Sequence, residues 1–256
     1  ITPDTTSIAN YKGAMIYGAD VEGKLWKLNL TNQGTLYEFT SLFTADATLA
    51  NDRLEFFQAT PGMGADGNLW AFYGTGNQKN YQRISSDIQN RIFAVKDKNF
   101  PNYSAINGQT PNSSSLVNAA NGICPTGAEL GWYDNLGASE RITGKLGLYN
   151  STIYASKYIP KQGQLCSPGS ASLSEHAMSC GSKSREIKLG EGIATGVVVH
   201  KNKIYVGIGG SGSVDVKDDK GNVVGKRKGN IITIAPINSG TAGDGVITQE
   251  SWREIF

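Results

Sequence analysis

The sequence is poor in the residues that most often carry chemistry or attract a charged partner. It has three cysteines, two histidines and eight prolines among 256 residues, and 18% of its residues are charged. The 24 basic and 22 acidic side chains leave a net charge of +2, so no strong field directs the chain to nucleic acid or to an anionic membrane surface. No apolar run approaches the ~18 residues of a membrane-spanning helix, so no membrane span is expected.

Motifs for several common chemistries are also missing. The sequence contains no C-x-x-C-H haem attachment, no G-x-S-x-G, no H-E-x-x-H and no P-loop. His200 precedes Lys201 and Asn202, a pattern typical of a solvated hairpin turn. We therefore expect no catalytic residues and no cofactor bound by this chain.

The cysteines at 124, 166 and 180 are an odd set, so at least one thiol lacks a partner within the chain. Of the possible bridges we expect Cys166–Cys180, which would stabilise the fold by roughly 3 kcal/mol in the chain-entropy model. Three reduced, buried cysteines are the alternative, because a sequence does not fix connectivity. A bridge would indicate an oxidising compartment, either the periplasm or the cell exterior.

Glycine is abundant, at 32 of 256 residues against an average near ~7%, which favours many turns. Short β segments separated by turn residues fill the sequence, and helical periodicity is almost absent. They form four groups, at about 1–48, 49–137, 138–190 and 191–256. The expected strands cover 14–17, 24–30, 35–39, 53–57, 68–73, 91–95, 145–149, 152–156, 185–189, 196–200, 203–207, 230–234 and 251–256.

The segment 24–30 alternates clearly. Lys24, Trp26, Leu28 and Leu30 share one side of this strand, and Leu25, Lys27 and Asn29 share the other. One face is therefore expected to be buried and the other wet.

Two recurring sequence patterns suggest that the strand groups are repeats. Trp26 and Trp70 each follow a leucine and a glycine turn that contains aspartate, and Tyr154 and Tyr205 each follow an isoleucine and an asparagine-containing turn. These spacings are close to the ~40–50 residues of a propeller blade. We predict an all-β propeller with about four blades in this chain; a β-sandwich is the alternative.

A polar insertion at 98–128 separates the second group from the third. Such a segment is either a functional loop or a mobile insertion. As a contact loop it would act through Asn107, Asn112, Ser113 and Ser114, whose side chains offer adaptable hydrogen bonding.

Asp215, Asp218 and Asp219 form the one acidic cluster that invites a calcium interpretation. An EF-hand loop needs oxygen ligands at its first, third and fifth positions, but Lys217 holds the third position counted from Asp215. The favoured interpretation is a hairpin that turns at residues 219–222.

Several segments in order along the chain carry a further pattern. Residues 17–30 are similar to Y-A-G-D-x-x-G-x-[WY]-[RK]-F-D-L, and residues 71–76 to an aromatic-F-G-T-G; residues 131–136 and 140–142 are similar to G-W-Y-x-x-L and G-E-R-V, and residues 251–254 to S-W-R-[EQ]. Together they resemble the C-terminal domain of PilY/PilC-type tip proteins of type IV pili. The residues that match the family motifs are Asp20, Gly23, Trp26, Gly74, Gly76, Trp132, Tyr133, Glu140, Arg141, Trp252 and Arg253.

The resemblance implies a modified, quinoprotein-like β-propeller at the tip of a pilus, outside the cell. Its implied role is that of a non-enzymatic adhesin and assembly factor that binds minor pilins and a host or abiotic surface receptor. The family's ring has about seven blades, so we expect this chain to be the C-terminal part of a longer protein, whose upstream portion covers the open sheet faces.

Calcium is not carried over from the family to this chain. Many relatives have an aspartate-rich calcium loop just before the first motif, whereas residues 4–10 here contain one carboxylate, Asp4. Calcium would therefore be bound upstream of this chain, if at all.

Two other functions use similar propellers. A quinone-dependent dehydrogenase needs a buried quinone, calcium, an aspartate base and usually vicinal cysteines, and no adjacent cysteine pair occurs here. A carbohydrate-binding propeller would stack sugars on exposed tryptophan or tyrosine rings.

Overall fold

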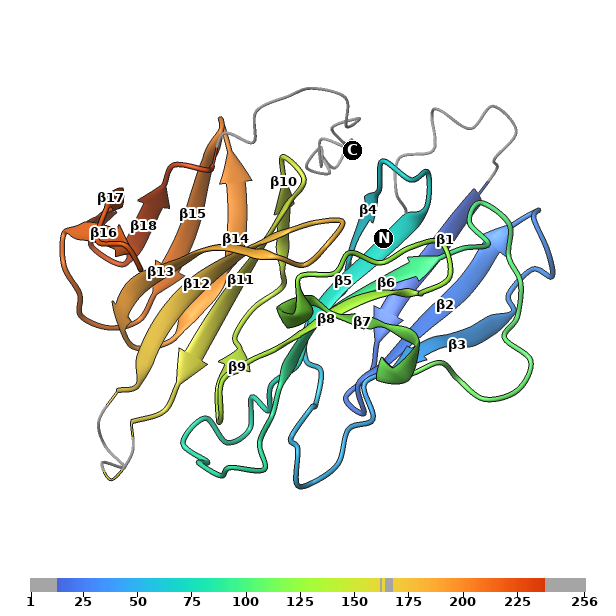
Figure 1. Cartoon of the computed structure of the whole chain (residues 1–256), viewed down its shortest axis with the longest axis horizontal. Helices are drawn as coiled ribbons and strands as arrows, with labels where there is room; N and C mark the ends of the chain where they lie inside the picture. Colours follow the sequence, from blue (N-terminus) through green and yellow to red (C-terminus); the bar gives the residue numbers. More distant parts are fainter. Residues whose placement is uncertain (1–12, 162, 164–167, 238–256) are drawn as a thin grey trace, which may run out of the picture.

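The structure, a computed structural model, describes residues 13–161, 163 and 168–237, and nearly all its regular elements are β-strands. The helical elements of the described part are two short 3-10 turns, η1 (Ser113–Ser115) and η2 (Ala119–Asn121). No helix within these ranges is long and apolar enough to cross a membrane. Figure 1 shows the strands as successive sheets that run from β1–β3 on the right to β14–β18 on the left.

Two separate sheets come first along the chain. Sheet 1 is antiparallel and consists of β1 (Gly13–Ala19), β2 (Lys24–Thr31) and β3 (Phe39–Thr44). Sheet 2 has the order β4-β5-β6-β8-β7, where β7 pairs parallel to β8. Its strands are β4 (Thr60–Met63), β5 (Leu69–Gly74), β6 (Arg91–Asp97), β7 (Val117–Asn118) and β8 (Gly131–Asn135).

The third and fourth strand groups are joined into one ten-stranded sheet. Unit 3 is the meander β10 (Gly147–Tyr149), β11 (Thr152–Ile159), β12 (Ser170–Ala177) and β13 (Lys183–Glu191), with β9 (Arg141–Ile142) paired to β11. Unit 4 has the order β14 (Ala194–His200), β15 (Lys203–Ile208), β18 (Ile231–Ile234) and β17 (Val223–Lys228). The join is β16 (Asp215–Asp218), which pairs with both β17 and β13.

Three hydrophobic cores lie between successive units rather than inside one sandwich. The first packs sheet 1 on one face of sheet 2, and the second packs the opposite face of sheet 2 on unit 3. The third fills the space between units 3 and 4. Because sheet 2 is covered on both faces, every residue of β5 is buried.

The aromatic residues that recur in the sequence lie at equivalent positions in the strand order. Trp26, Trp70, Tyr154 and Tyr205 lie in the second strand of sheet 1, sheet 2, unit 3 and unit 4, respectively. The recurring aromatic residues thus share a position in the strand order of each group.

Strand β2 buries its more polar face. Leu25, Lys27, Asn29 and Thr31 are buried, whereas the alternate positions are half-exposed. Lys27 tolerates burial because its Nζ lies 2.6 Å from Oδ2 of Asp97, at the end of β6. The segment thus has one dry face, as expected, but an ion pair lies within it.

The opposite face of sheet 1, here called the outer face, is apolar. Strand register aligns Ile16 with Leu28 and Leu28 with Phe39. Ile16 is 37% and Phe39 65% exposed. The outer face comprises Ala14, Ile16, Gly18, Trp26, Leu28, Leu30, Phe39 and Ser41.

Several expected strands are displaced or absent. The expected strand 35–39 lies almost wholly before β3, because Tyr37 has a left-handed φ of 63° that places it in a turn. Residues 53–57 form no strand, since the Glu55 carboxylate accepts the Phe57 backbone N–H at 2.8 Å and turns the chain. The expected strand 251–256 lies outside the described residues.

The polar insertion is packed into the molecule. Phe100, Tyr103, Leu116 and Ala119 are buried, and residues 117–118 supply β7. The insertion 98–128 is therefore anchored to the rest of the fold, because these side chains complete two of the cores.

Candidate functional site

A cleft of about 880 Å³ lies between sheet 2 and unit 3. The end of β8 and the turn after it form one wall, and the face of β11–β13 forms the other. We call it the inter-sheet cleft. Its lining includes Asp134, Asn135, Leu136, Gly137, Glu140, Lys157, Ile159, Ser170, Ser172, Ser174, Lys183, Glu186, Lys188 and Glu191.

A buried lysine with two carboxylates lies in this cleft. Lys157 is 5% exposed, and its Nζ lies 2.8 Å from Oε1 of Glu186 and 3.5 Å from Oε2 of Glu140. Burial alone would raise the pKa of Glu186, but the Lys157 charge and hydrogen bonds outweigh it and hold that pKa below its usual value. The cleft therefore keeps fixed charges of both signs.

Alternate positions of β12 carry serines, and the next position on the same face is a buried histidine. Ser174 Oγ lies 3.0 Å from Nε2 of His176, and Nδ1 of His176 lies 3.0 Å from the Gly181 carbonyl oxygen. Burial lowers the pKa of His176, so its neutral ring donates to Gly181 and accepts from Ser174.

The Ser–His pair does not form a catalytic triad. The nearest carboxylate oxygen, Oδ2 of Asp134, is 3.7 Å from Nδ1, beyond hydrogen-bond distance. Ser174 lines the cleft but is only 1% exposed, so its hydroxyl is poorly placed to attack a substrate. The chemistry that the cleft offers is hydrogen bonding and charge pairing, and none of the described residues that line it is aromatic.

The first family-motif residues stabilise a turn. Asp20 accepts the Trp26 indole N–H at 2.7 Å and the backbone N–H of Lys24 at 3.0 Å. Gly23 has φ 73°, and a Cβ there would lie 2.8 Å from the Arg53 carbonyl oxygen. Asp66 repeats the arrangement by accepting the Trp70 indole at 3.1 Å.

Two further family motifs pack against each other. A Cβ on Gly74 would lie 2.5 Å from Cγ1 of Ile142, and one on Gly76 would lie 2.6 Å from Cβ of Arg141. Both glycines are therefore needed for close approach of β9. Glu140 accepts the Gly137 backbone N–H at 2.8 Å and also lines the cleft.

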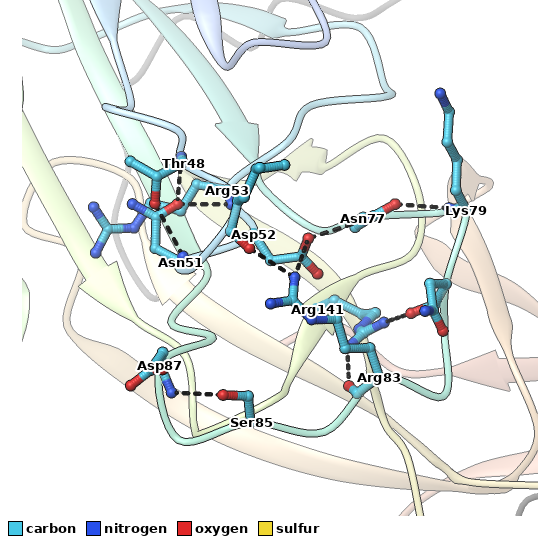
Figure 2. A network of polar contacts seen from close by, with 12 residues as sticks. Thr48, Asn51, Asp52, Arg53, Asn77, Lys79, Arg83, Ser85, Asp87 and Arg141 are labelled. Atoms are coloured by element: carbon cyan, nitrogen blue, oxygen red, sulfur yellow. Dashed lines mark hydrogen bonds and ion pairs between the residues drawn. The ribbon is translucent and has the colours of Figure 1, made fainter.

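Arg141 organises a loop, as Figure 2 shows. Its fully buried guanidinium donates to the carbonyl oxygens of Asn80 and Arg83. A guanidinium nitrogen of Arg83 lies 3.3 Å from Oδ1 of Asp52. The same Asp52 oxygen accepts a hydrogen bond from the Asn77 side-chain amide. The motif arginine thus fixes the 77–90 loop against β9.

Trp132 and Tyr133 connect neighbouring parts of the fold. The Trp132 indole donates to the Met178 carbonyl oxygen at 2.8 Å, and its ring stacks on His176. The Arg91 guanidinium lies over the Tyr133 ring, 4.3 Å from its centroid. Trp252 and Arg253 lie outside the described residues, as does Asp4.

The disulfide differs from the expected pair. Cys124 and Cys180 are bonded, with their Cα atoms 4.4 Å apart, so the Cys166–Cys180 prediction is wrong. Residues 119–121 form η2 against β8, which places the following Cys124 beside the turn between β12 and β13. Cys166 lies outside the described residues.

The predicted contact residues divide into two kinds. Asn112 caps η1 by accepting from the Ser114 backbone at 3.0 Å, and Ser113 Oγ accepts from the Arg91 guanidinium at 2.7 Å. Asn107 and Ser114 are exposed. These residues lie on a different segment from the inter-sheet cleft.

The acidic cluster at 215–219 forms the expected hairpin. Asp215 forms an ion pair with Lys226 across β16 and β17, and Asp218 accepts the Asn222 backbone N–H at 2.8 Å. Within the described ranges no three His, Cys, Asp or Glu side chains gather as a metal site. Asp219 pairs through its backbone N–H with the Glu186 carbonyl oxygen.

The cleft residues Lys157, Ser172, Ser174 and Glu186 were not identified from the sequence. Residues 170–176 alternate serine with other residues and end at His176, a period-2 pattern that indicates a strand with one polar face. That pattern predicts the strand β12 and its serine-bearing face. It does not predict that the end of β8 forms the opposite wall of the cleft.

Buried Glu55 gives the protein a specific pH dependence. Burial raises the pKa of Glu55 well above its usual value, despite backbone hydrogen bonds from Phe57 and Phe56 that lower it. The folded state then holds a proton that the unfolded chain has lost, so stability falls as pH rises above ~4.5, by up to about 1.4 kcal/mol per pH unit. In urea unfolding between pH 4 and 8 we expect Glu55→Gln to remove this slope; an equal slope in both proteins would contradict the assignment.

Comparison with known proteins gives a match in fold. No family model matches the sequence, and no curated protein sequence matches it. The structure is similar to the C-terminal domain of Pseudomonas aeruginosa PilY1, with a TM-score of 0.51 and 11% identity over 75% of this chain. BamB from Moraxella catarrhalis aligns over 90% of this chain and 85% of its own, with 10% identity and a TM-score of 0.20.

The chain spans 55% of the PilY1 C-terminal domain that it matches. At this identity the likeness concerns the fold. It confirms the all-β, modified-propeller prediction and the structural side of the sequence resemblance: the chain has a propeller-like fold similar to that of the PilY1 C-terminal domain.

Proposed function

We propose that this chain is part of a non-enzymatic type IV pilus protein, a tip adhesin and assembly factor that acts outside the cell. The main observation in favour of this proposal is the similarity in fold to the PilY1 C-terminal domain. Support also comes from the ordered sequence motifs, whose glycines, tryptophans and Arg141 hold the turns and sheet contacts described above. The proposed partners are minor pilins and a host or abiotic surface receptor.

The proposal is tested by deleting the gene in the bacterium that carries it. We expect fewer surface pili and weaker attachment, and both should return when the gene is supplied in trans. Normal piliation together with normal attachment would contradict the proposal. Purified protein should show no quinone absorption band, whereas a band would favour the dehydrogenase alternative.

The exposed part of the insertion is the proposed receptor contact. Deleting 98–128 is an unsuitable test, because it removes the buried residues Phe100, Tyr103 and Leu116. Substituting Asn107→Glu and Ser114→Glu changes exposed positions, so we expect weaker surface attachment and a melting temperature within ~2 °C of the parent. Unchanged attachment in an adhesion assay would remove this contact assignment.

An upstream portion of the same protein is the proposed cover of the outer face of sheet 1. The face is apolar and half-exposed, unlike both faces of sheet 2, which are buried. It presents far fewer than the ~20–30 residues a side of a stable protein–protein interface. A sheet tethered in the same chain needs no such area, because its effective concentration is high.

This cover predicts different effects in two lengths of the protein. In residues 1–256 alone, Leu28→Lys with Phe39→Lys should lower binding of the dye ANS and leave the melting temperature unchanged. In the longer gene product the same pair should lower the melting temperature, because two lysines would be buried. Leu49→Lys, at a position 90% exposed in a loop, is the control; equal melting behaviour in both lengths would contradict the cover.

A further inference from the structure

A second, smaller hollow lies at the end of sheet 1, away from the inter-sheet cleft. Its volume is about 320 Å³, and it separates the end of β1 from the segment 55–58. We call it the Glu55 pocket. Its walls are Gly18, Ala19, Asp20 and Val21 on one side and Glu55, Phe56, Phe57 and Gln58 on the other. This volume is at the lower limit for ligand pockets, which suits a single side chain better than a cofactor.

Glu55 is a buried carboxyl group with an unused oxygen. Its side chain is 2% exposed, and Oε1 accepts the Phe57 backbone N–H at 2.8 Å. Oε2 is buried and has no hydrogen-bond partner, and no basic side chain of the described chain forms an ion pair with Glu55. Because burial raises the pKa of Glu55, the carboxyl holds a proton in the free protein. A cation that enters would release this proton and give the buried oxygen the partner that it lacks.

The rest of the pocket also favours a positive group. Asp20 adds a second carboxylate, held in place by Lys24 N–H and the Trp26 indole. Phe56 and Phe57 are half-buried aromatic rings, whose faces attract cations. None of the described residues that line the pocket is basic, and the nearby Lys24 Nζ is engaged by Glu22 at 3.0 Å.

The carboxyl and aromatic groups suit an organic cation better than a metal ion. Calcium requires six to eight oxygen ligands at short distances, and within the described ranges no cluster of three acidic, histidine or cysteine side chains occurs. An ammonium or guanidinium group needs one or two carboxylate oxygens and gains further from aromatic faces.

We infer that the Glu55 pocket binds one ammonium or guanidinium group, the side chain of a lysine or arginine presented by a partner protein. The cation preference stands on the pocket alone. The identity of that partner as a pilus protein rests on the proposed function.

The experiment is an NMR titration of residues 1–256 at pH 7.5 with acetyl-arginine amide and its uncharged isostere acetyl-citrulline amide. We expect shifts of the backbone amides at 18–21 and 55–58, and at least tenfold weaker binding of the citrulline compound. Glu55→Gln should weaken arginine-amide binding at least tenfold. Asp87→Asn makes the matching carboxyl-to-amide change at an exposed position outside the pocket, and it should leave binding nearly unchanged.

Val21→Lys provides a second variant that leaves Glu55 intact. Val21 is 57% exposed and lines the pocket, so the variant should fold, and its own ammonium should compete with the probe and weaken binding. Equal binding of the two compounds, no binding, or unchanged binding in Glu55→Gln would overturn the inference. Because the titration uses isolated protein and a small probe, its failure leaves the piliation test of the proposed function independent.

Discussion

Replacing Asp97 with alanine is expected to destabilise the protein by about 3–5 kcal/mol, because it leaves the Lys27 ammonium buried without its carboxylate. The two side chains are 3% and 1% exposed, and their charged atoms lie 2.6 Å apart. The Tyr17 hydroxyl donates to the same Asp97 oxygen at 2.6 Å, and Lys27 also donates to the Asn102 carbonyl oxygen at 3.1 Å. The pair connects β2 of sheet 1 to the end of β6, so its loss weakens the contact between two sheets.

The burial of Lys27 is already costly in the native protein. Burial lowers the pKa of Lys27, and the Asp97 charge only partly opposes this. Removing both charges together, in Lys27→Met with Asp97→Leu, should therefore recover most of the loss seen in Asp97→Ala. Urea unfolding of the parent, of Lys27→Met, of Asp97→Leu and of the double variant gives the coupling energy.

An exposed ion pair supplies the matched control. Lys226 and Asp215 have side chains 69% and 43% exposed, so Asp215→Ala should change the free energy of unfolding by no more than about 1 kcal/mol. A similarly small effect of Asp97→Ala would contradict the view that the Lys27 pair stabilises the contact between sheets 1 and 2.

The sequence predicts strands well where both faces of a sheet are apolar. The Leu69–Tyr73 run is apolar because sheet 2 is covered on both sides, and β5 lies where expected. Strand β12 was missed because its serines contact the cleft rather than a core. The buried side of β2 was not evident either, because the polarity of Lys27 is offset by Asp97, a residue far along the chain.

The candidate sites depend on contacts between distant segments. Glu140 and Lys157 lie on opposite sides of the inter-sheet cleft, and Gly18 and Glu55 on opposite sides of the Glu55 pocket. Periodicity indicates which side of a strand a residue occupies, but it carries no information about which strand faces it. The motif residues were easier to interpret, since Asp20 and Trp26 interact within a single turn.

Cysteine substitutions should separate the observed disulfide from the pair expected on sequence grounds. Cys124 and Cys180 are 56 residues apart, and closing a loop of this length stabilises a protein by about 4 kcal/mol in the chain-entropy model. We therefore expect Cys124→Ser and Cys180→Ser each to lower the free energy of unfolding by up to that amount, as measured in urea without reductant. Cys166→Ser should leave it unchanged, and peptide mapping without reduction should recover a Cys124–Cys180 pair.

Loss of the disulfide should have a local effect in addition to the entropic one, because a second contact also holds the turn between β12 and β13. Trp132 donates its indole N–H to the Met178 carbonyl oxygen, two residues before Cys180. Breaking the disulfide should thus increase hydrogen exchange at residues 119–124 and 178–182, while the Trp132 contact keeps β8 and β12 protected. Destabilisation by Cys166→Ser, or a mapped peptide that joins Cys166 to another cysteine, would contradict the Cys124–Cys180 assignment.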